Sequence, residues 1–328
     1  MDFNEIIGHD RIIENLKNAI KEEHLSHCYL FEGENSIGKK KVALAFAKTL
    51  LCKGEGLEPC NRCRSCLKFN SWNHPDLMFI KPENGLIKKK VIDDLIKDLS
   101  KAPFESKRRI IIIDDSHEIG IEGQNALLKT LEEPPSYINI ILITSNSNNL
   151  IPTILSRCEI VKFSPVESHK IIDLLTRKYG KSLEEANFIA NFTKGSIGKS
   201  IEICESDSFF EKRDEIIEII VSILTGDKVR IFNSMDFFLG NKDNYQEILD
   251  IILYWFRDLI IYKQTRDLNL ILNKDKLPTL SKAPDLKLDR INDIIDSIIE
   301  TKQNIDRNVN YQLAIEIMLL RIQEGLNI

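Results

Sequence analysis

The sequence of 328 residues has no apolar run that approaches the ~20 residues required by a membrane-spanning helix. Its first ten residues are polar and lack the apolar core of a signal peptide. These two absences predict a cytoplasmic protein with no membrane partner. Thiols stay reduced in that compartment, so disulfide bonds do not account for the seven cysteines.

Positive charge is not in excess either, because the formal net charge is −5. This value excludes a general attraction of the chain to nucleic acid. Two local basic clusters are left, Lys88–Lys90 and Lys107–Arg109, and each is interpreted as a phosphate contact or as the solvated end of a helix or strand. With 43% apolar and 29% charged residues, the composition is that of a globular protein rather than a disordered one.

Four cysteines lie together in CKGEGLEPCNRCRSC, with the spacing C-x7-C-x2-C-x2-C. They are Cys52, Cys60, Cys63 and Cys66. Two residues between cysteines form a tight turn that directs both thiolates to one ion, and four thiolates suit a tetrahedral, structural Zn²⁺. The metal would supply folding energy to a loop-rich module with little core of its own. Reduced thiols without a ligand and an iron–sulfur cluster are the alternatives.

Apolar runs alternate with helical periodicity through the first half of the chain. The runs predict five strands: Cys28–Phe31, Asp76–Ile80, Arg109–Asp115, Ile138–Asn146 and Glu159–Phe163. The periodic segments between them predict helices at Asp10–Glu22, Lys39–Leu51, Lys88–Leu99 and Gln124–Leu131. An almost wholly apolar strand such as RIIIIDD is buried on both faces, so the prediction is an α/β core with a parallel sheet.

The texture changes after Pro165. Residues 166–207 predict short helices with a turn at Gly195 and Gly198, and residues 208–328 show helical periodicity throughout. We therefore expect three segments: an α/β domain at 1–165 that contains the cysteine module at 52–66, a small helical domain at 166–207, and an all-α domain at 208–328.

The segment GENSIGKKK follows the first strand and departs from a phosphate-binding P-loop at one position. Gly33, Gly38 and Lys39 fit the pattern, in which backbone N–H groups and an ammonium converge on phosphate. Lys40 replaces the hydroxyl that ligates Mg²⁺, and an ammonium has donors only. The sequence leaves open whether ATP binds here or the loop keeps only its shape.

The strand that ends in Asp114 and Asp115 bears the second departure. A hydrolytic site places an Asp and then a catalytic Glu there. Asp114 retains the ability to hold magnesium, but Asp115 is one methylene shorter than Glu. A displacement of roughly 1 Å costs about 10²-fold in rate. Two departures in separate parts of the site argue against hydrolysis by this chain.

Several longer motifs occur in a fixed order: LSHCYLFEGENSIGKKKVALAFAKTLLC, the cysteine module, NHPDL, RIIIIDDSHEI, NALLKTLEEPP and LIPTILSRC. With them the chain resembles the bacterial DNA polymerase III clamp-loader subunits of the AAA+ family, and among these the delta-prime type. The resemblance is dense to about residue 165 and thins beyond 207. It implies an AAA+ core, a small helical lid and a helical collar within a five-subunit ring.

The resemblance also implies roles for single residues. Arg157, in SRC, corresponds to an arginine finger that reaches the ATP site of a neighbouring subunit, where its fixed fork of donors meets phosphate oxygens. Thr144 corresponds to a sensor near the γ-phosphate, and Lys199 lies near a second sensor but receives no role. A surface ion pair is the alternative for Arg157.

The implied function is that of a stator, with little or no ATP hydrolysis of its own, in the ring that loads the sliding clamp onto primed DNA. Its implied partners are the gamma/tau and delta subunits, the clamp and DNA. The main alternative is an ATP-hydrolysing gamma/tau-type motor subunit. A zinc-containing nucleic-acid-binding protein unrelated to clamps would show strong, salt-dependent DNA binding as a monomer, which the net charge of −5 disfavours.

Overall fold

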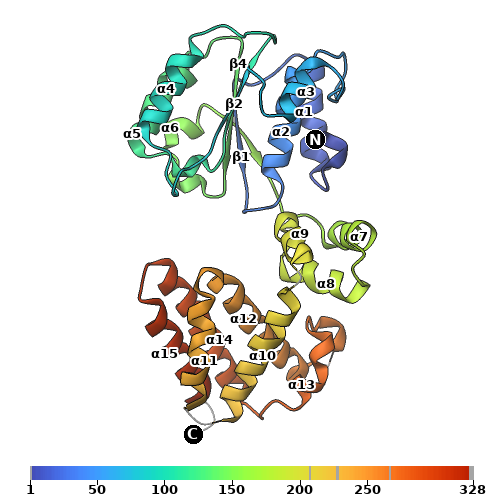
Figure 1. Ribbon diagram of the computed structural model, residues 1–328, viewed down its shortest axis with the longest axis vertical. Helices are drawn as coiled ribbons and strands as arrows, with labels where there is room; N and C mark the ends of the chain where they lie inside the picture. The colour runs from blue at the N-terminus through green and yellow to red at the C-terminus, as the bar shows by residue number, and fades with distance from the viewer. Residues whose placement is uncertain (1, 207, 227–228, 266, 325–328) are drawn as a thin grey trace. The chain divides into compact units, whose positions relative to one another are not determined.

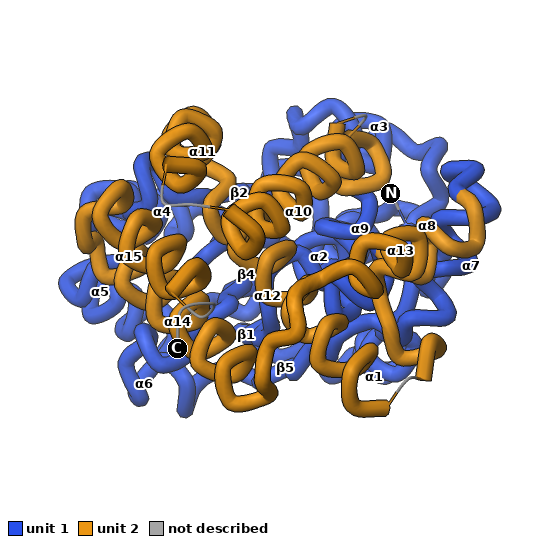
Figure 2. The backbone as a smooth tube through the Cα atoms, turned by 90° about the horizontal axis from the view of Figure 1, so that it is seen from below, with its two compact units in different colours: residues 1–181, 189–202 blue, residues 182–188, 203–328 orange. Residues whose placement is uncertain are grey.

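The computed structural model (Figure 1) describes residues 2–206, 208–226, 229–265 and 267–324. The chain forms two compact units, which Figure 2 shows in different colours. One comprises Met1–Lys181 and Ile189–Glu202, and the other comprises Ser182–Phe188 and Ile203–Ile328. The units divide the chain differently from the three expected segments, whose boundaries stay a prediction.

The described part of the first unit contains a five-stranded, wholly parallel sheet with the order β2-β3-β4-β1-β5. Its strands are β1 (Cys28–Glu32), β2 (Leu77–Ile80), β3 (Arg109–Ile113), β4 (Ile138–Thr144) and β5 (Glu159–Lys162). Every residue of β3 and β4 is buried, as the apolar runs predict. The expected parallel α/β core is therefore confirmed.

Helices precede, connect and follow these strands. Those before residue 166 are α1 (Asp10–Lys21), α2 (Lys39–Leu51), α3 (Arg64–Asn70), α4 (Lys89–Leu99), α5 (Ile121–Glu132) and α6 (Pro152–Leu155). The next are α7 (Ser168–Tyr179), α8 (Leu183–Phe192) and α9 (Ile197–Glu205). Short 3-10 helices in the described chain are η1 (Phe3–Glu5), η2 (Ser116–Glu118), η3 (Ser147–Asn149), η4 (Lys242–Asn244), η5 (Leu268–Leu270) and η6 (Lys274–Lys276).

The two faces of the sheet are covered by different helices, because side chains alternate along each strand. Tyr29 and Phe31 face the layer formed by α1, α2 and α3, whereas Leu30 faces the layer of α4, α5 and α6 (Figure 1). Each Leu, Ile or Phe side chain fully buried in this way contributes about 1.5–3 kcal/mol. The sheet therefore holds the loops at the carboxyl ends of its strands on a rigid base.

The second unit is helical in its described residues, as its periodicity predicts. Its α-helices after residue 208 are α10 (Phe209–Thr225), α11 (Val229–Gly240), α12 (Tyr245–Gln264), α13 (Leu277–Ser281), α14 (Leu288–Asp306) and α15 (Tyr311–Glu324). Helix α12 packs against α10 and α14, and α15 packs against α11 and α14. The carboxylate of Asp258, fully buried on α12, accepts hydrogen bonds from the backbone of Leu272 and Asn273 and so fixes the segment before α13.

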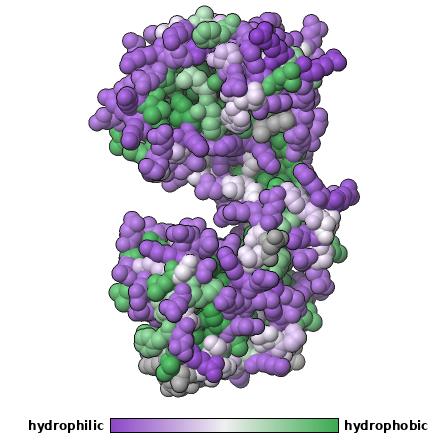
Figure 3. Space-filling view, viewed as in Figure 1, coloured by the Kyte–Doolittle hydropathy of each residue, from purple (hydrophilic) through white to green (hydrophobic). Residues whose placement is uncertain are grey.

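No helix in the described ranges is both long enough and apolar enough to cross a bilayer. Hydrophilic side chains cover most of the face shown in Figure 3, with smaller hydrophobic areas between them.

Candidate functional site

The loop from Gly33 to Lys39 joins β1 to α2 at the carboxyl edge of the sheet. Its first N–H, from Gly33, donates a 3.2 Å hydrogen bond to the carbonyl of Thr144 at the end of β4. Gly38 precedes the helix with φ = 110°, a left-handed value that residues with a side chain rarely adopt. The loop thus leads from the end of β1 directly into the amino-terminal end of α2.

The ammonium of Lys39 is bound by the loop itself. Its Nζ donates to the carbonyls of Gly33 at 2.6 Å and of Glu34 at 2.5 Å. The side chain is buried, and this burial lowers the pKa of Lys39, while the nearby carboxylates of Asp115 and Asp114 oppose the shift. The cation that would neutralise phosphate in a working P-loop instead closes the loop on itself.

Lys40 lies against the carboxylate expected to hold the metal. Its Nζ is 3.0 Å from Oδ2 of Asp114 and 4.7 Å from the centre of the Phe79 ring on β2. An ammonium has no lone pair to give a metal and repels a dication, so these side chains do not fit a Mg²⁺ ion as they stand. The first departure seen in the sequence, Lys40, thus places its cation on Asp114, the carboxylate that the pattern expects to hold the metal.

The amino-terminal end of α9 fastens the middle of the loop. The hydroxyl of Ser196 donates to the carbonyl of Asn35 at 3.2 Å, and the N–H of Gly198 donates to that of Ser36 at 2.7 Å. A Cβ on Gly198 would lie 2.8 Å from the Ser36 carbonyl oxygen. Only glycine therefore allows α9 to approach the loop this closely.

The carbonyl of Ile37 is held by His9, the residue before α1. Nε2 of His9 lies 2.7 Å from the carbonyl oxygen of Ile37, so this nitrogen carries the proton and donates. Burial lowers the pKa of His9, which keeps the ring neutral. Each carbonyl from Gly33 to Ile37 thus accepts a hydrogen bond from Lys39, α9 or His9.

Thr144, the expected sensor, is fully buried at the end of β4. Its Oγ1 accepts the N–H of Asn146 at 3.0 Å and lies 3.3 Å from Nδ1 of His117. The hydroxyl is therefore already engaged within the chain. Lys199, on α9, is exposed.

Arg157 follows α6 and lies on the surface, with 32% of its side chain exposed. Its Nη2 is 2.7 Å from Oε1 of Glu132, the last residue of α5. Its Nη1 donates to the carbonyl of Thr153 at 2.9 Å and to Oγ of Ser156 at 3.3 Å. The guanidinium is thus accessible, and in the free chain it takes part in the surface ion pair weighed as the alternative to a finger.

The four clustered cysteines converge as their spacing predicts. The sulfur atoms of Cys52, Cys60, Cys63 and Cys66 all lie within 4.8 Å of one another. Backbone N–H groups donate to them, from Cys60 to the sulfur of Cys52 at 3.3 Å and from Cys66 to that of Cys63 at 3.4 Å. Such N–H···S bonds stabilise thiolates, and the backbone N–H groups of Arg62 and Cys63 lower the pKa of Cys60 to about 6. This donor set fits a tetrahedral zinc ion.

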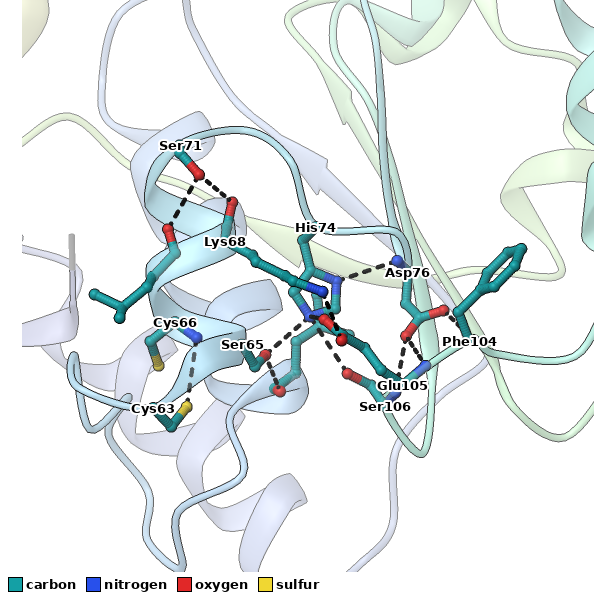
Figure 4. Close-up of polar contacts among 12 residues, drawn as sticks. Cys63, Ser65, Cys66, Lys68, Ser71, His74, Asp76, Phe104, Glu105 and Ser106 are labelled. Atoms are coloured by element: carbon teal, nitrogen blue, oxygen red, sulfur yellow. Dashed lines mark hydrogen bonds and ion pairs between the residues drawn. The ribbon is translucent and has the colours of Figure 1, made fainter.

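A buried polar cluster ties this module to the core (Figure 4). The Nδ1 atom of His74 accepts the N–H of Asp76 at 3.1 Å, so its proton is on Nε2, 2.9 Å from the hydroxyl of Ser65. That hydroxyl in turn donates to the carbonyl of Leu51 at 2.5 Å, at the end of α2. Helix α3, which begins after Cys63, is thereby fixed to the helix that follows the P-loop-like segment.

The carboxylate of Asp76 is fully buried and holds the other side of the same cluster (Figure 4). It accepts backbone N–H groups from Phe104 at 2.6 Å, Glu105 at 3.0 Å and Ser106 at 2.8 Å. Burial raises the pKa of this carboxyl, but the three hydrogen bonds outweigh burial and lower it. Asp76 thus fixes the loop before β3.

The two basic clusters differ in how far their side chains are exposed. Lys88, Lys89 and Lys90 are exposed at the start of α4. Arg109, in contrast, is 2% exposed, forms an ion pair with Asp98 and donates to its carbonyl at 2.7 Å. The interpretation of Lys107–Arg109 as a surface cluster is therefore wrong for Arg109, because this side chain points into the core at the start of β3.

Some residues of the site were missed from the sequence. The sequence predicts a turn at Gly195 and Gly198 and assigns no role to Ser196, His9, Phe79 or Glu132. Gly198 in TKGSIGKS is the local signal of a close approach between backbones. Contacts between segments as distant as Asn35 and Ser196, 161 positions apart, have no local signature.

Comparison with known proteins shows which family the chain belongs to. Residues 8–167 match the family described as DNA polymerase III, delta subunit, and residues 207–324 match DNA polymerase III, delta subunit, C terminal. The chain is 33% identical over 321 residues to the DNA polymerase III subunit delta′ of Bacillus subtilis (strain 168), with 96% of each chain covered.

Two further similarities are weaker. The subunit tau of the same organism is 25% identical over 348 residues, which cover 98% of this chain and 61% of tau. A gamma subunit-related protein from Thermotoga maritima has a similar structure, with a TM-score of 0.49, 19% identity and coverage of 95% of this chain and 99% of that one. From the family matches and the similarity to delta′ along almost its whole length, the chain belongs to the delta′ type of DNA polymerase III subunits.

Proposed function

We propose that this protein is the stator of a clamp loader, with little or no ATP hydrolysis of its own. The observation that carries the proposal is the 3.0 Å pair between Lys40 and Asp114. Phosphoryl transfer in P-loop proteins depends on a metal that bridges phosphate oxygens, and here a lysine cation lies on the carboxylate that would help to bind it. The loss of the metal position removes the main electrostatic element of hydrolysis.

The fastened loop supports the same conclusion. A P-loop binds phosphate through a backbone that wraps the anion and a lysine that reaches it. In this chain Lys39 is turned onto the carbonyls of Gly33 and Glu34, and α9 is bonded to Asn35 and Ser36. ATP would have to break these bonds before it could be held by Gly33, Gly38, Lys39, Asp114 and Thr144.

Arg157 is the residue proposed to act in catalysis, as an arginine finger in trans. Its guanidinium is at the surface, where a neighbouring subunit can approach. A planar fork of donors stabilises the charge that spreads over the γ-phosphate oxygens in the transition state. Because the neighbour supplies the ATP and this chain supplies the arginine, hydrolysis depends on correct assembly of the ring.

Zinc is proposed as a structural cofactor held by Cys52, Cys60, Cys63 and Cys66. All four positions of a tetrahedral ion would then be filled by sulfur, which leaves none open for chemistry. The ion would order the loop between α2 and α3.

The proposed partners are the gamma/tau and delta subunits, the sliding clamp and primed DNA, in the cytoplasm. For DNA, the amino-terminal ends of α4 and α5 offer support. Lys88, Lys89, Gly120 and Ile121 line a pocket of about 360 Å³ between them, and neither helix has a side-chain cap. Helix ends without a side-chain cap and lysines together favour phosphate oxygens. The AAA+, lid and collar boundaries at 165 and 207 belong to the same proposal.

The proposal is tested by calorimetry of Mg²⁺-ATP on the isolated chain and by ATP turnover in the reconstituted ring. We expect no tight magnesium-dependent binding, and no change in turnover on Lys39→Ala. Arg157→Ala should leave assembly intact and reduce turnover at the neighbouring site, by up to the order of 10³–10⁵ known for arginine fingers. Arg177→Ala, which removes an exposed ion-paired arginine on α7, is the matched control.

Two outcomes would reject parts of the proposal. Tight magnesium-dependent ATP binding, with turnover that disappears on Lys39→Ala, would identify the chain as a gamma/tau-type motor subunit. Unchanged turnover on Arg157→Ala in the assembled ring would reject the finger.

A further inference from the structure

Arg157 is held by hydrogen bonds within its own chain, which it must exchange for phosphate if it acts as the proposed finger. The inference rests on that proposed role. We infer that Glu132 is a positioning residue that retains the Arg157 guanidinium in the free chain and releases it to the phosphate of a neighbouring nucleotide. Glu132 thereby sets how readily the finger is delivered when the ring assembles.

Arg157 uses several of its hydrogen-bond donors within its own chain. Its Nη1 donates to Thr153 and Ser156, and its Nη2 donates to Glu132. Both terminal nitrogens are therefore engaged within the chain. A guanidinium has five N–H donors and three are used here, so release from Glu132 frees both hydrogens of Nη2, which together with Nε can then form two parallel N–H···O bonds to a phosphate.

Glu132 lies at an unfavourable position for a carboxylate. It is the last residue of α5, where the negative end of the helix dipole disfavours a carboxylate and favours a cation. Glu132 is therefore not placed to stabilise its own helix. Its structural partner in the free chain is Arg157, and the guanidinium lies where both the carboxylate and the helix end attract it.

The ion pair between Glu132 and Arg157 is weak. Its side chains are 32% and 50% exposed, so water screens the attraction. Exposed pairs of this kind shift an equilibrium by a factor of about five at most. A nucleotide phosphate, which carries more charge than a carboxylate, competes successfully with such a pair. Glu132 is strong enough to bias the position of Arg157 and too weak to prevent its transfer.

The test uses the assembled ring with gamma/tau-type and delta-type partners. Glu132→Gln keeps the shape of the side chain and removes its charge. We expect this variant to raise ATP turnover at the neighbouring site about two- to fivefold, in kcat rather than KM. The rise should shrink with added salt. Glu132→Asp, which keeps the charge with a shorter reach, should give a smaller rise.

Glu133→Gln is the matched control, because it neutralises the adjacent exposed carboxylate and should leave turnover unchanged. The Glu132→Gln rise should also disappear in an Arg157→Ala background. Turnover that stays the same or falls on Glu132→Gln would overturn the inference, as would a rise that persists without Arg157. The effect of Arg157→Ala alone reports on the finger itself, so failure of the finger is distinguishable from failure of the Glu132 role.

Discussion

The Nζ atom of Lys40, in the first turn of α2, lies 3.0 Å from Oδ2 of Asp114, which directly follows β3. The same ammonium lies over the ring of Phe79, whose edge meets Trp72 with ring centres 5.4 Å apart. A lysine, an aspartate and two aromatic rings thus form one chain of contacts from the metal position to the residues just after α3. The cation is supported from two sides, which explains how it persists on a half-exposed surface.

Replacing this cation should reopen the metal position. Lys40→Thr introduces the hydroxyl of a working P-loop and removes the repulsion of a dication. We expect magnesium-dependent ATP binding to tighten by up to about fivefold, which corresponds to a repulsion of about 1 kcal/mol after allowance for the exposure of Lys40. Calorimetry with Mg²⁺-ATP, and with ATP and EDTA, measures the effect.

Lys40→Arg is the control, because it keeps the charge and should behave as the parent. Equal affinities of Lys40→Thr and the parent, with and without magnesium, would show that the lysine does not block the site. In that case the hydrogen bonds on the loop carbonyls would be the dominant obstacle.

Gly198 offers a test of those bonds. Alanine usually stabilises a helix relative to glycine by up to about 1 kcal/mol. Here its Cβ would lie 2.8 Å from a backbone oxygen of Ser36 and 2.9 Å from the Ser36 Cβ, and neither atom is the end of a flexible chain. We expect Gly198→Ala to destabilise the first unit by about 1–3 kcal/mol, as overpacking does. Denaturant unfolding measures this, and faster hydrogen exchange at the amino-terminal end of α9 should accompany it.

Gly240→Ala is the contrasting variant. A Cβ on Gly240, at the end of α11, would have no neighbour within 4 Å. It should leave stability unchanged or slightly higher. If Gly198→Ala behaved in the same way, α9 could move away from the loop without cost, and the fastening would carry little energy.

The sequence predicts the core of this molecule well because its signals are local. The strands are short apolar runs, and the run RIIII can only be buried on both faces, as β3 is. The convergence of four cysteines also follows from their spacing, since turns of C-x2-C bring the sulfur atoms together.

The parts that escaped prediction depend on distant partners. Lys107–Arg109 is a basic cluster by composition, but the guanidinium of Arg109 turns inward to Asp98 and to the carbonyl of Lys101. The replacement of a hydroxyl by Lys40 was evident in the sequence, whereas its pairing with Asp114 required the register of the sheet. Side-chain direction and long-range contact are set by tertiary packing, which no local pattern records.

Metal content should depend on the cysteine cluster alone. Protein purified without chelator should contain about one zinc ion per chain, and Cys66→Ser should lose it, because Cys66 is a buried member of the set. Inductively coupled plasma mass spectrometry measures the zinc content per chain. Hydrogen exchange should increase in α3, which begins at the cluster, since structural metal binding supplies folding energy.

Cys204→Ser, which removes a buried thiol outside the cluster, should keep the ion. A parent protein without zinc, with four freely titratable thiols in the cluster, would refute the site. An iron signal in place of zinc would support the iron–sulfur alternative.

Asp76 should make the stability of the first unit depend on pH in the acid range. Its folded-state pKa lies below the ordinary value because three backbone N–H groups favour the charged form against the cost of burial. A depressed carboxyl pKa adds stability that is present above the unfolded pKa, about 3.9, and is lost as pH falls through the folded pKa. Asp76→Asn turns an amide toward these donors, and should cost about 1–3 kcal/mol at neutral pH.

The difference between Asp76→Asn and the parent should therefore be largest at pH 7 and should shrink below about pH 4. Denaturant unfolding of the first unit at a series of pH values measures it. Asp94→Asn removes a carboxylate that is 60% exposed on α4 and should change little at any pH. His74 titrates in a different window, because its burial lowers its pKa and costs stability as pH falls below about 6.5. A penalty for Asp76→Asn that is the same at pH 7 and pH 3 would mean that shape, and not charge, makes Asp76 hold the loop before β3.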